Sequence, residues 1–183
     1  AAVQLSRAES QSTVEQWQQQ VNSSINAEEE LLIDPRFFIA LQTRFPQITW
    51  VEIQPKHGLS ENELTQFRYD VILHLGTDVP VREVSWLNWQ LDQLSLTQVE
   101  NKLSQEQPEY LAIRGVPNQR VQQALQIREW LENPPAVETV AQLRSLVAQQ
   151  PIGIHPEQLW ELGQNLGYSV ELSWWESSQD GSI

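Results

Sequence analysis

The sequence contains neither cysteine nor methionine among its 183 residues. The absence of cysteine excludes disulfides, thiolate metal sites and cysteine nucleophiles. It also fits a reducing compartment, and we therefore expect a cytoplasmic protein. No apolar run approaches the roughly 20 residues that a membrane-spanning helix requires, and no basic start followed by an apolar stretch indicates a signal peptide.

Basic residues are scarce. The sequence has 11 lysine and arginine residues against 24 aspartate and glutamate residues, which gives a formal net charge of −13. Nucleic acids and anionic membrane surfaces both attract basic faces, so we expect neither as a partner. An acidic surface can meet a basic partner, although more often it only keeps a protein in solution.

The motifs of cofactor and metal chemistry are missing as well. The seven glycines are scattered, and no glycine-rich phosphate loop follows a strand. A nucleotide-like cofactor requires such a turn for close approach to the backbone. The G-x-S-x-G motif of serine hydrolases is also absent. The three histidines (His57, His74 and His155) lie too far apart for a metal-ligand pattern, so we expect no metal site.

The first half of the chain indicates a mixed fold. Apolar residues at helical spacing predict a helix within 12–32, and Asp34 followed by Pro35 predicts the start of another. Runs of apolar and alternating residues predict strands at Ile48–Gln54 and Phe67–Leu75. Because only a loop and a short polar connection separate these strands, they must be antiparallel.

The second half is richer in helices. Residues 76–94 are irregular and indicate an anchored loop or a short helix, and Tyr110–Ile113 predicts a short strand. Residues 168–174 alternate like a strand, 177–181 form a turn, and Ile183 would begin a partner strand. The predicted hairpin is incomplete, because the chain ends where its second strand would begin. This favours the interpretation that the chain is a fragment of a longer polypeptide. Further helices are predicted to begin at Ser95, at Asn118, near Val140 and at Pro156, the last ending at Gly167.

The two predicted strands carry the most specific motif of the chain. It consists of Val51–Lys56 (VEIQPK) followed by Asn62–Val71 (NELTQFRYDV). This motif closely resembles the last two strands of the methyltransferase regions embedded in nonribosomal peptide synthetases. Weaker similarities to the same regions follow in order along nearly the whole chain: Glu29–Pro35 before Phe37 and Phe38, Val116–Asn118 with Arg120, Pro156 with Glu157, and Gly167 with Tyr168 and Trp174.

The resemblance implies an α/β to α+β fold in two parts. Residues 1–80 would be the C-terminal part of a class I methyltransferase-like domain that ends in the antiparallel hairpin 48–54/67–75. Residues 81–183 would form a helix-rich α+β lobe ending in a strand and leading back toward an adenylation domain. The family's glycine-rich donor motif would lie upstream of Ala1.

The resemblance also implies an activity. Such regions methylate an aminoacyl unit, usually on nitrogen, that a carrier-protein domain holds on its phosphopantetheine arm. The methyl donor of the complete region is S-adenosylmethionine, bound by an N-terminal half-sheet. We therefore expect this chain alone to bind no cofactor and to be inactive.

A geometric argument suggests site residues in the connection between the strands. Ligands of open α/β sheets lie at the carboxyl ends of the parallel strands. If Ile48–Gln54 is the last parallel strand, Asn62 and Glu63 face the substrate entrance, with Arg68 and Tyr69 just inside. Glu63 can hold or deprotonate an amine, which must be neutral to attack a methyl group, and Asn62 can orient the substrate by hydrogen bonding.

Each of these residues also has a purely structural interpretation. Asn62 and Glu63 can cap the turn. Arg68 can pair with a neighbouring acid, and Tyr69 can be a core residue. His57 stands where the family usually has a basic residue.

Two other functions are open at this point. A noncatalytic module could dock a carrier or adenylation domain through its acidic surface, and a plain α+β protein could bind no ligand. The eight tryptophans do not decide between them. The helical phase places Trp130 and Trp160 in the core, whereas the neighbours Trp174 and Trp175 point to opposite faces of a strand.

Overall fold

The computed structural model describes the chain except for residues 1–4, 6, 61, 77–83, 151–152 and 175–180. Among the described residues the named elements follow one another as α2 (Val14–Asn26), α3 (Pro35–Arg44), β1 (Ile48–Pro55), α4 (Glu63–Phe67), β2 (Tyr69–Leu75), β3 (Trp86–Asn88), α5 (Leu96–Glu106), β4 (Ala112–Arg114), α6 (Gln119–Glu132), α7 (Val140–Ala148) and α8 (Pro156–Leu166). The predicted mixture of helices and strands is confirmed.

The chain divides into two compact units, and each is built from separate stretches of sequence. The first unit joins Ala1–Leu32 with Val121–Ile152, and the second joins Ile33–Arg120 with Gly153–Ile183. This division differs from the predicted one into 1–80 and 81–183. The predicted boundary lies outside the described residues and stays a prediction.

In the first unit, the starts of α2 and α7 are tied together. Thr13 and Thr139 each cap a helix within a capping box completed by a glutamine side chain. The same two threonines form an antiparallel bridge, and the N–H of Val14 donates to the carbonyl of Glu138 at 3.1 Å. The caps therefore fix both where the helices begin and how their first turns meet.

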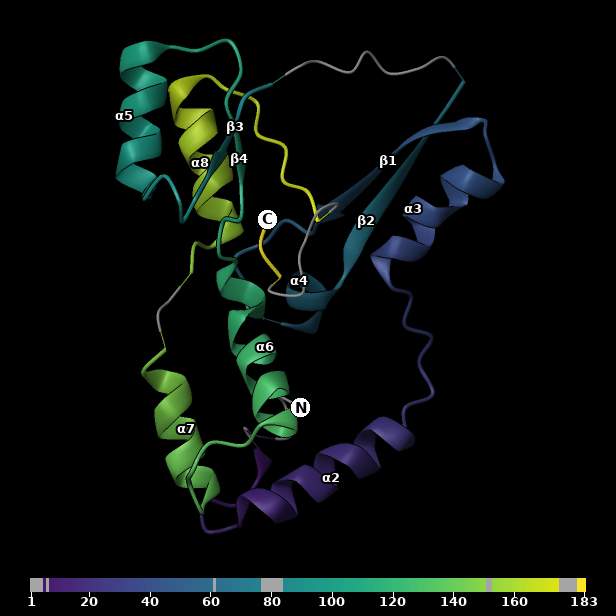
Figure 1. The fold of residues 1–183 in the computed structure, drawn as a ribbon, viewed down its shortest axis with the longest axis vertical. Coiled ribbons are helices and arrows are strands. Elements are labelled where there is room, and N and C mark those ends of the chain that lie inside the picture. The colour runs from purple at the N-terminus through teal and green to yellow at the C-terminus, as the bar shows by residue number, and fades with distance from the viewer. Residues whose placement is uncertain (1–4, 6, 61, 77–83, 151–152, 175–180) are drawn as a thin grey trace. The chain divides into compact units, whose positions relative to one another are not determined.

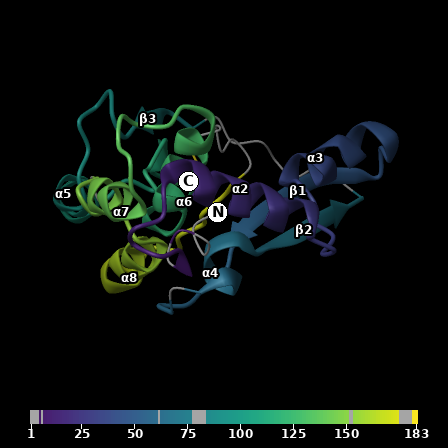
Figure 2. The same cartoon turned by 90° about the horizontal axis from the view of Figure 1, so that it is seen from below.

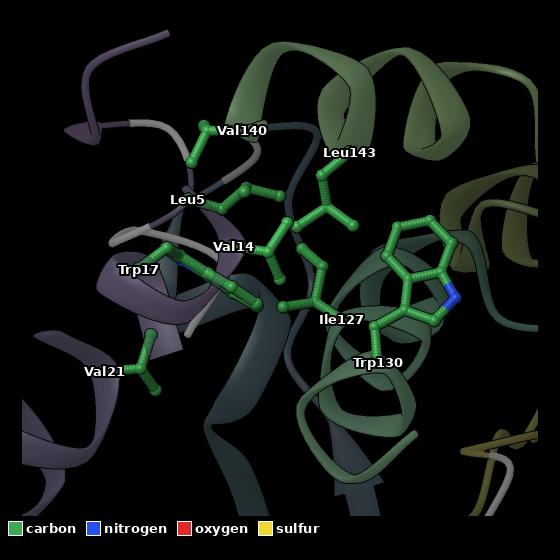
Figure 3. Packing of buried hydrophobic residues seen from close by; sticks show 8 residues of the cluster. All are labelled: Leu5, Val14, Trp17, Val21, Ile127, Trp130, Val140 and Leu143. Carbon is green, nitrogen blue, oxygen red and sulfur yellow. The ribbon is translucent and has the colours of Figure 1, made fainter. Parts of the chain in front are cut away.

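The core of the first unit forms where the apolar faces of α2, α6 and α7 converge. Trp17 and Val21 on α2 are fully buried, as are Val140 and Leu143 on α7. Trp130 of α6 is 8% exposed, which confirms its predicted place in a core. Figure 3 shows the whole cluster, which consists of Leu5, Val14, Trp17, Val21, Ile127, Trp130, Val140 and Leu143.

In the second unit, the predicted antiparallel hairpin is confirmed. β1 pairs with β2 in a register that runs from Ile48 opposite Leu75 to Pro55 opposite Tyr69. Helix α3 lies along this pair of strands (Figures 1 and 2), and its apolar side packs on the hairpin. The small core that results contains Ile48, Val51 and Ile53, with Phe38, Leu41, Tyr69, Val71 and Trp174 packed against it.

The N-cap residue of α3, Asp34, should make the stability of the protein depend on pH in acid. The carboxylate of Asp34 accepts hydrogen bonds from the guanidinium of Arg36 and from the backbone N–H of the same residue, and these bonds lower the pKa of Asp34 from 3.8 to about 2. A lowered pKa in the folded state means stability that is present above about pH 4 and lost as the pH falls through about 2.

We expect Asp34→Asn to keep the N-cap but to remove this pH dependence. Because the pair is exposed, the effect should be at most about 1 kcal/mol. Unfolding free energies of both proteins between pH 5 and pH 2 measure it. A difference between the proteins that is constant over this range would contradict the prediction.

A second sheet corrects the prediction for residues 76–94. β3 pairs in parallel with β4 in the register Trp86 to Ala112, Leu87 to Ile113 and Asn88 to Arg114. The described residues 86–88 are thus a strand, not a loop or a helix. The predicted strand Tyr110–Ile113 is confirmed with shifted ends. A parallel partner lies far away in the sequence, so local periodicity does not reveal it.

Helices α5 and α8 form the other core of the second unit. Ser95 caps α5, and Gly167 ends α8 with φ of 78°, a left-handed conformation that glycine adopts without strain. Both predicted ends are confirmed. The buried residues of this core are Trp89, Val99, Leu103, Val116 and Leu159.

The strand predicted at residues 168–174 is wrong. The alternation is real, because Tyr168, Val170 and Leu172 pack against the α5–α8 core while their polar neighbours are exposed. However, the described residues form no strand ladder there. Ile183 exchanges two backbone hydrogen bonds with Val116, at 2.9 and 3.0 Å, instead of with this segment. All but Gly181 of the predicted turn at 177–181 lies outside the described residues.

Gly163 provides a sharp test of this packing. A Cβ atom added there would lie 2.1 Å from Cγ2 of Val170, which is too close for any real contact. We expect Gly163→Ala to lower the free energy of unfolding by about 1–3 kcal/mol, although alanine is otherwise the better helix former. Chemical denaturation measures this effect. The double variant with Val170→Ala should recover most of the loss, and a more stable single variant would contradict the packing.

Candidate functional site

Asn62, the first candidate residue, caps helix α4. Its side-chain oxygen accepts hydrogen bonds from the backbone N–H groups of Leu64 at 2.9 Å and Thr65 at 3.2 Å. The hydroxyl of Thr65 accepts the N–H of Asn62 in return, at 3.2 Å. The structural interpretation of Asn62 is therefore confirmed. The connection that sequence patterns described as polar and irregular contains a short capped helix, and Phe67 ends that helix instead of starting β2.

Glu63 and Arg68 are brought together. Their side chains form an ion pair of 3.2 Å and are 67% and 38% exposed, respectively. The expectation that Arg68 pairs with a neighbouring acid is thus confirmed, while Asp70 pairs with Lys56 instead. An exposed pair of this kind is weak. The Glu63 carboxylate is accessible to solvent.

Tyr69 belongs to the hairpin core. Its hydroxyl donates to the carbonyl of Ile33, and its ring packs edge-on against Phe38 at 6.4 Å and Trp174 at 6.2 Å. Burial raises the pKa of the phenol above its ordinary value of 10, and the nearby Asp34 carboxylate adds to this shift. Tyr69 is only partly buried, so the core interpretation is confirmed in part.

A buried charged centre lies next to this connection, and sequence patterns did not single it out. Arg120, the second residue of α6, is only 3% exposed. Its guanidinium donates to the carbonyls of Lys56 and Gly58, and to that of Thr65 at 3.4 Å. Glu157 of α8 lies 3.5 Å from the same guanidinium.

The two charges have different surroundings. Burial lowers the pKa of Arg120, and the Glu157 carboxylate opposes that shift. Glu157 also accepts the backbone N–H of Gly58 at 2.6 Å, and its side chain is 16% exposed. Glu157 therefore both neutralises the guanidinium and holds the same connection that Arg120 holds.

Local sequence explains why these residues meet. The side-chain oxygen of Asn118 accepts the N–H of Arg120 at 3.0 Å and so caps the start of α6. Asn118 also forms a parallel bridge with Ile154, just before the start of α8 at Pro156. The two helix starts therefore lie side by side. The resemblance at Val116–Asn118, Arg120, Pro156 and Glu157 was the sequence signal that could have identified this centre.

His57 and Trp160 extend the centre toward solvent. Their rings stack with centroids 3.6 Å apart and an interplanar angle of 28°. His57 also lies 3.5 Å from Glu157. Trp160 is half-buried under this imidazole, so its predicted place in a core is only partly right.

Another polar pair lies on the hairpin, on the face that points away from the buried residues Val51 and Ile53. His74 lies 2.5 Å from Glu52, which also accepts the side-chain amide of Gln54 at 2.7 Å. Among the described residues, no group of three or more His, Cys, Asp and Glu side chains could hold a metal ion. Likewise, none of the helices in the described part of the chain is long and apolar enough to cross a membrane.

The connection from β1 to α4 does not form the turn that a nucleotide-like methyl donor requires. Such a donor requires a glycine-rich turn from a strand into a helix. β1 instead leads into the loop held by Arg120 and then into α4, whose first N–H groups are taken up by Asn62. The site presents the exposed carboxylate of Glu63 on a connection that Arg120 and Glu157 hold by hydrogen bonds.

Comparison with known proteins places the chain among large synthetases. No family model matches it. It is 38% identical over 191 residues to chondramide synthase of Chondromyces crocatus, covering 100% of this chain and 5% of that protein. It is 34% identical over 175 residues to a nonribosomal peptide synthetase of Penicillium thymicola, with 87% of this chain and 6% of that protein covered.

A more distant relative extends the same picture. The cyclosporin synthetase of Tolypocladium inflatum is 27% identical over 183 residues, which cover 92% of this chain and 1% of that protein. The chain thus spans only a small part of the length of the curated relatives that it matches. It is therefore related, along its whole length, to a short stretch of nonribosomal peptide synthetases.

Proposed function

We propose that the chain is the C-terminal part of a methyltransferase region within a nonribosomal peptide synthetase. The region would methylate the amino group of an aminoacyl unit that a carrier-protein domain holds on its phosphopantetheine arm. The observation that carries this proposal is the hairpin: the methyltransferase-like motif forms two paired strands, β1 and β2, in a chain related to such synthetases.

The exposed side of the hairpin supports a place at the end of a larger sheet. Among the described residues, β2 pairs only with β1. Three apolar side chains of β2, those of Ile72, Leu73 and Leu75, are 40%, 40% and 68% exposed. A hairpin of two strands is at best marginally stable alone. Further strands of the region would extend the sheet at its edge, and elements packed on the two faces of the sheet would cover these side chains.

The exposed carboxylate of Glu63 supports a role toward the amine. An amine must be neutral to attack a methyl group, and a carboxylate within hydrogen-bonding reach can hold it or take its proton. Asn62 would keep this carboxylate in place through the cap of α4, and Arg68 would balance its charge. Tyr69 would support the connection from the hairpin core.

The other parts of the reaction lie outside these residues. S-adenosylmethionine would be the methyl donor of the complete region and would bind to other parts of it. The carrier-protein domain would deliver the substrate, and an adenylation domain would be the neighbour of the helix-rich part. The cytoplasm is the compartment that we propose for the protein.

The test compares the chain with the complete region. The synthetase region that includes this stretch, and the chain alone, are each assayed for methyl transfer from S-adenosylmethionine to an aminoacyl-loaded carrier. Calorimetry measures binding of the donor to each. We expect the complete region to bind the donor and to methylate, and the chain alone to do neither. Binding of one donor per isolated chain, or a complete region that loads but does not methylate, would overturn the proposal.

A noncatalytic docking module is the alternative, in which the acidic surface, with a net charge of −13, would meet a basic partner. In that case the chain alone would capture a carrier or adenylation domain of the same pathway in a pull-down. The complete region would then not depend on Glu63 for any reaction.

A further inference from the structure

We propose that Arg120, together with Glu157, is a positioning residue that holds the β1–β2 connection and so places Glu63 for the amine. The catalytic consequence rests on the proposed function, whereas the hold on the connection does not. Arg120 and Glu157 come from the starts of α6 and α8, far from the hairpin in the sequence. The helix-rich part of the chain would therefore determine the geometry of the candidate site.

The guanidinium of Arg120 binds the connection both before α4 and within this helix. It donates to the carbonyls of Lys56 and Gly58 before the helix, and to that of Thr65 within it, at 3.4 Å. Arginine presents its N–H donors in one rigid plane, which lysine does not. A single buried plane therefore fixes the distance between the two ends of the segment that carries Asn62 and Glu63.

Glu157, the ion-pair partner of Arg120, holds the same segment. Its carboxylate accepts the N–H of Gly58 at 2.6 Å while lying 3.5 Å from the Arg120 guanidinium. Gly58 is thus held through both its N–H and its carbonyl. Its φ of 134° is a conformation that side chains rarely adopt, and an added Cβ would lie 3.1 Å from Cγ2 of Thr65.

This arrangement is poorly explained as a device for stability alone. Buried ion pairs contribute little net stability, because desolvation offsets their attraction. Moreover, Nε of Arg120 and Nδ2 of Asn118 are buried without a hydrogen-bond partner in the described part of the chain. An apolar side chain in place of Arg120 would avoid the burial of a charge and of the unpaired Nε. It could not bind the carbonyls of Lys56, Gly58 and Thr65 at once.

Arg144 offers a matched control in the other compact unit. Its guanidinium also binds backbone carbonyls, those of Leu5 at 2.7 Å and Ala8 at 2.5 Å. It therefore holds the segment that contains Leu5 and Ala8 by the same chemistry, but in the first unit. Arg120 and Arg144 should differ in which backbone amides they protect.

The hold on the connection is tested by hydrogen–deuterium exchange of the full chain. In Arg120→Gln we expect the amides of Gly58 and Thr65 to exchange at least about tenfold faster, with the α2 amides unchanged. Arg144→Gln should leave the Gly58 and Thr65 amides unchanged. Should Arg120→Gln not fold, Glu157→Ala serves as the second variant, because it removes the acceptor of the Gly58 N–H and should also speed exchange at Gly58. Unchanged exchange at Gly58 and Thr65, or equal acceleration in Arg144→Gln, would overturn the hold.

The catalytic consequence is tested in the complete synthetase region. For Arg120→Lys we expect kcat for methylation of the carrier-bound amine to fall by up to about 100-fold, since displacements of about 1 Å can cost this much. The KM for S-adenosylmethionine should change less than about twofold, because the donor binds elsewhere. A merely structural role would lower the amount of folded protein and leave the kcat of the folded fraction unchanged, which would overturn the positioning role. A wild-type region without methyl transfer would refute the proposed function, while the exchange result would still decide the hold.

Discussion

Replacing Trp17 with alanine is expected to lower the free energy of unfolding by about 3–5 kcal/mol. Trp17 is fully buried in the first core, which also contains residues of α6 and α7 (Figure 3). Truncation removes the largest of the fully buried side chains and leaves a cavity that three helices cannot easily close. Chemical denaturation followed by circular dichroism measures the effect.

Two further variants make this prediction specific. Trp86 on β3 is 58% exposed, so Trp86→Ala should change stability by about 0.5 kcal/mol or less. Trp17→Phe should cost clearly less than Trp17→Ala, because it fills much of the space. It also removes the indole N–H, which is buried without a partner in the described part of the chain. If Trp17→Ala were as mild as Trp86→Ala, the first core would not be as described.

Replacing Glu63 with glutamine is expected to slow methylation of a carrier-bound amine by about 10²–10⁴-fold in the complete synthetase region. This is the usual contribution of a residue that transfers a proton in the transition state. The change preserves the size of the side chain and removes its negative charge. The Arg68 partner is 38% exposed, so its loss of an ion pair should hardly affect folding.

The matched control is Glu106→Gln. Glu106 is also exposed and also forms an ion pair, with Lys102 at 2.8 Å, but it lies on α5. Its replacement should leave the rate of methyl transfer within about twofold. Single-turnover assays with a preloaded carrier separate the methylation step from loading. Equal rates for Glu63→Gln and Glu106→Gln would show that Glu63 only balances the charge of Arg68.

The caps show how far local sequence determines this structure. Thr13, Asp34, Ser95 and Thr139 all lie at helix starts, and Gly167 lies at a helix end. A cap acts between residues two or three positions apart, so the information is contained in a short window of sequence. For the same reason the β1–β2 hairpin was predictable, since a short connection leaves its strands no other way to pair.

The candidate site was only partly predictable. The motif around Asn62 and Glu63 identified the connection between the strands, and the structure pairs Glu63 with Arg68. The structural interpretations of Asn62 and Tyr69 were also open from the sequence, and the structure confirms that of Asn62 and, in part, that of Tyr69. The substrate-binding roles of these residues stay predictions.

By itself, the sequence determined most of the longer helices, the hairpin and the relation to peptide synthetases, because each depends on neighbouring residues or on the order of residues. Only the tertiary structure decided that β3 pairs with β4, that residues 168–174 form no strand ladder, and that Arg120 is buried against Lys56, Gly58 and Glu157. The physical reason is the same in each case. Backbone pairing and the burial of a charge depend on residues that are distant in the sequence. No local pattern specifies which of these distant residues will be in contact.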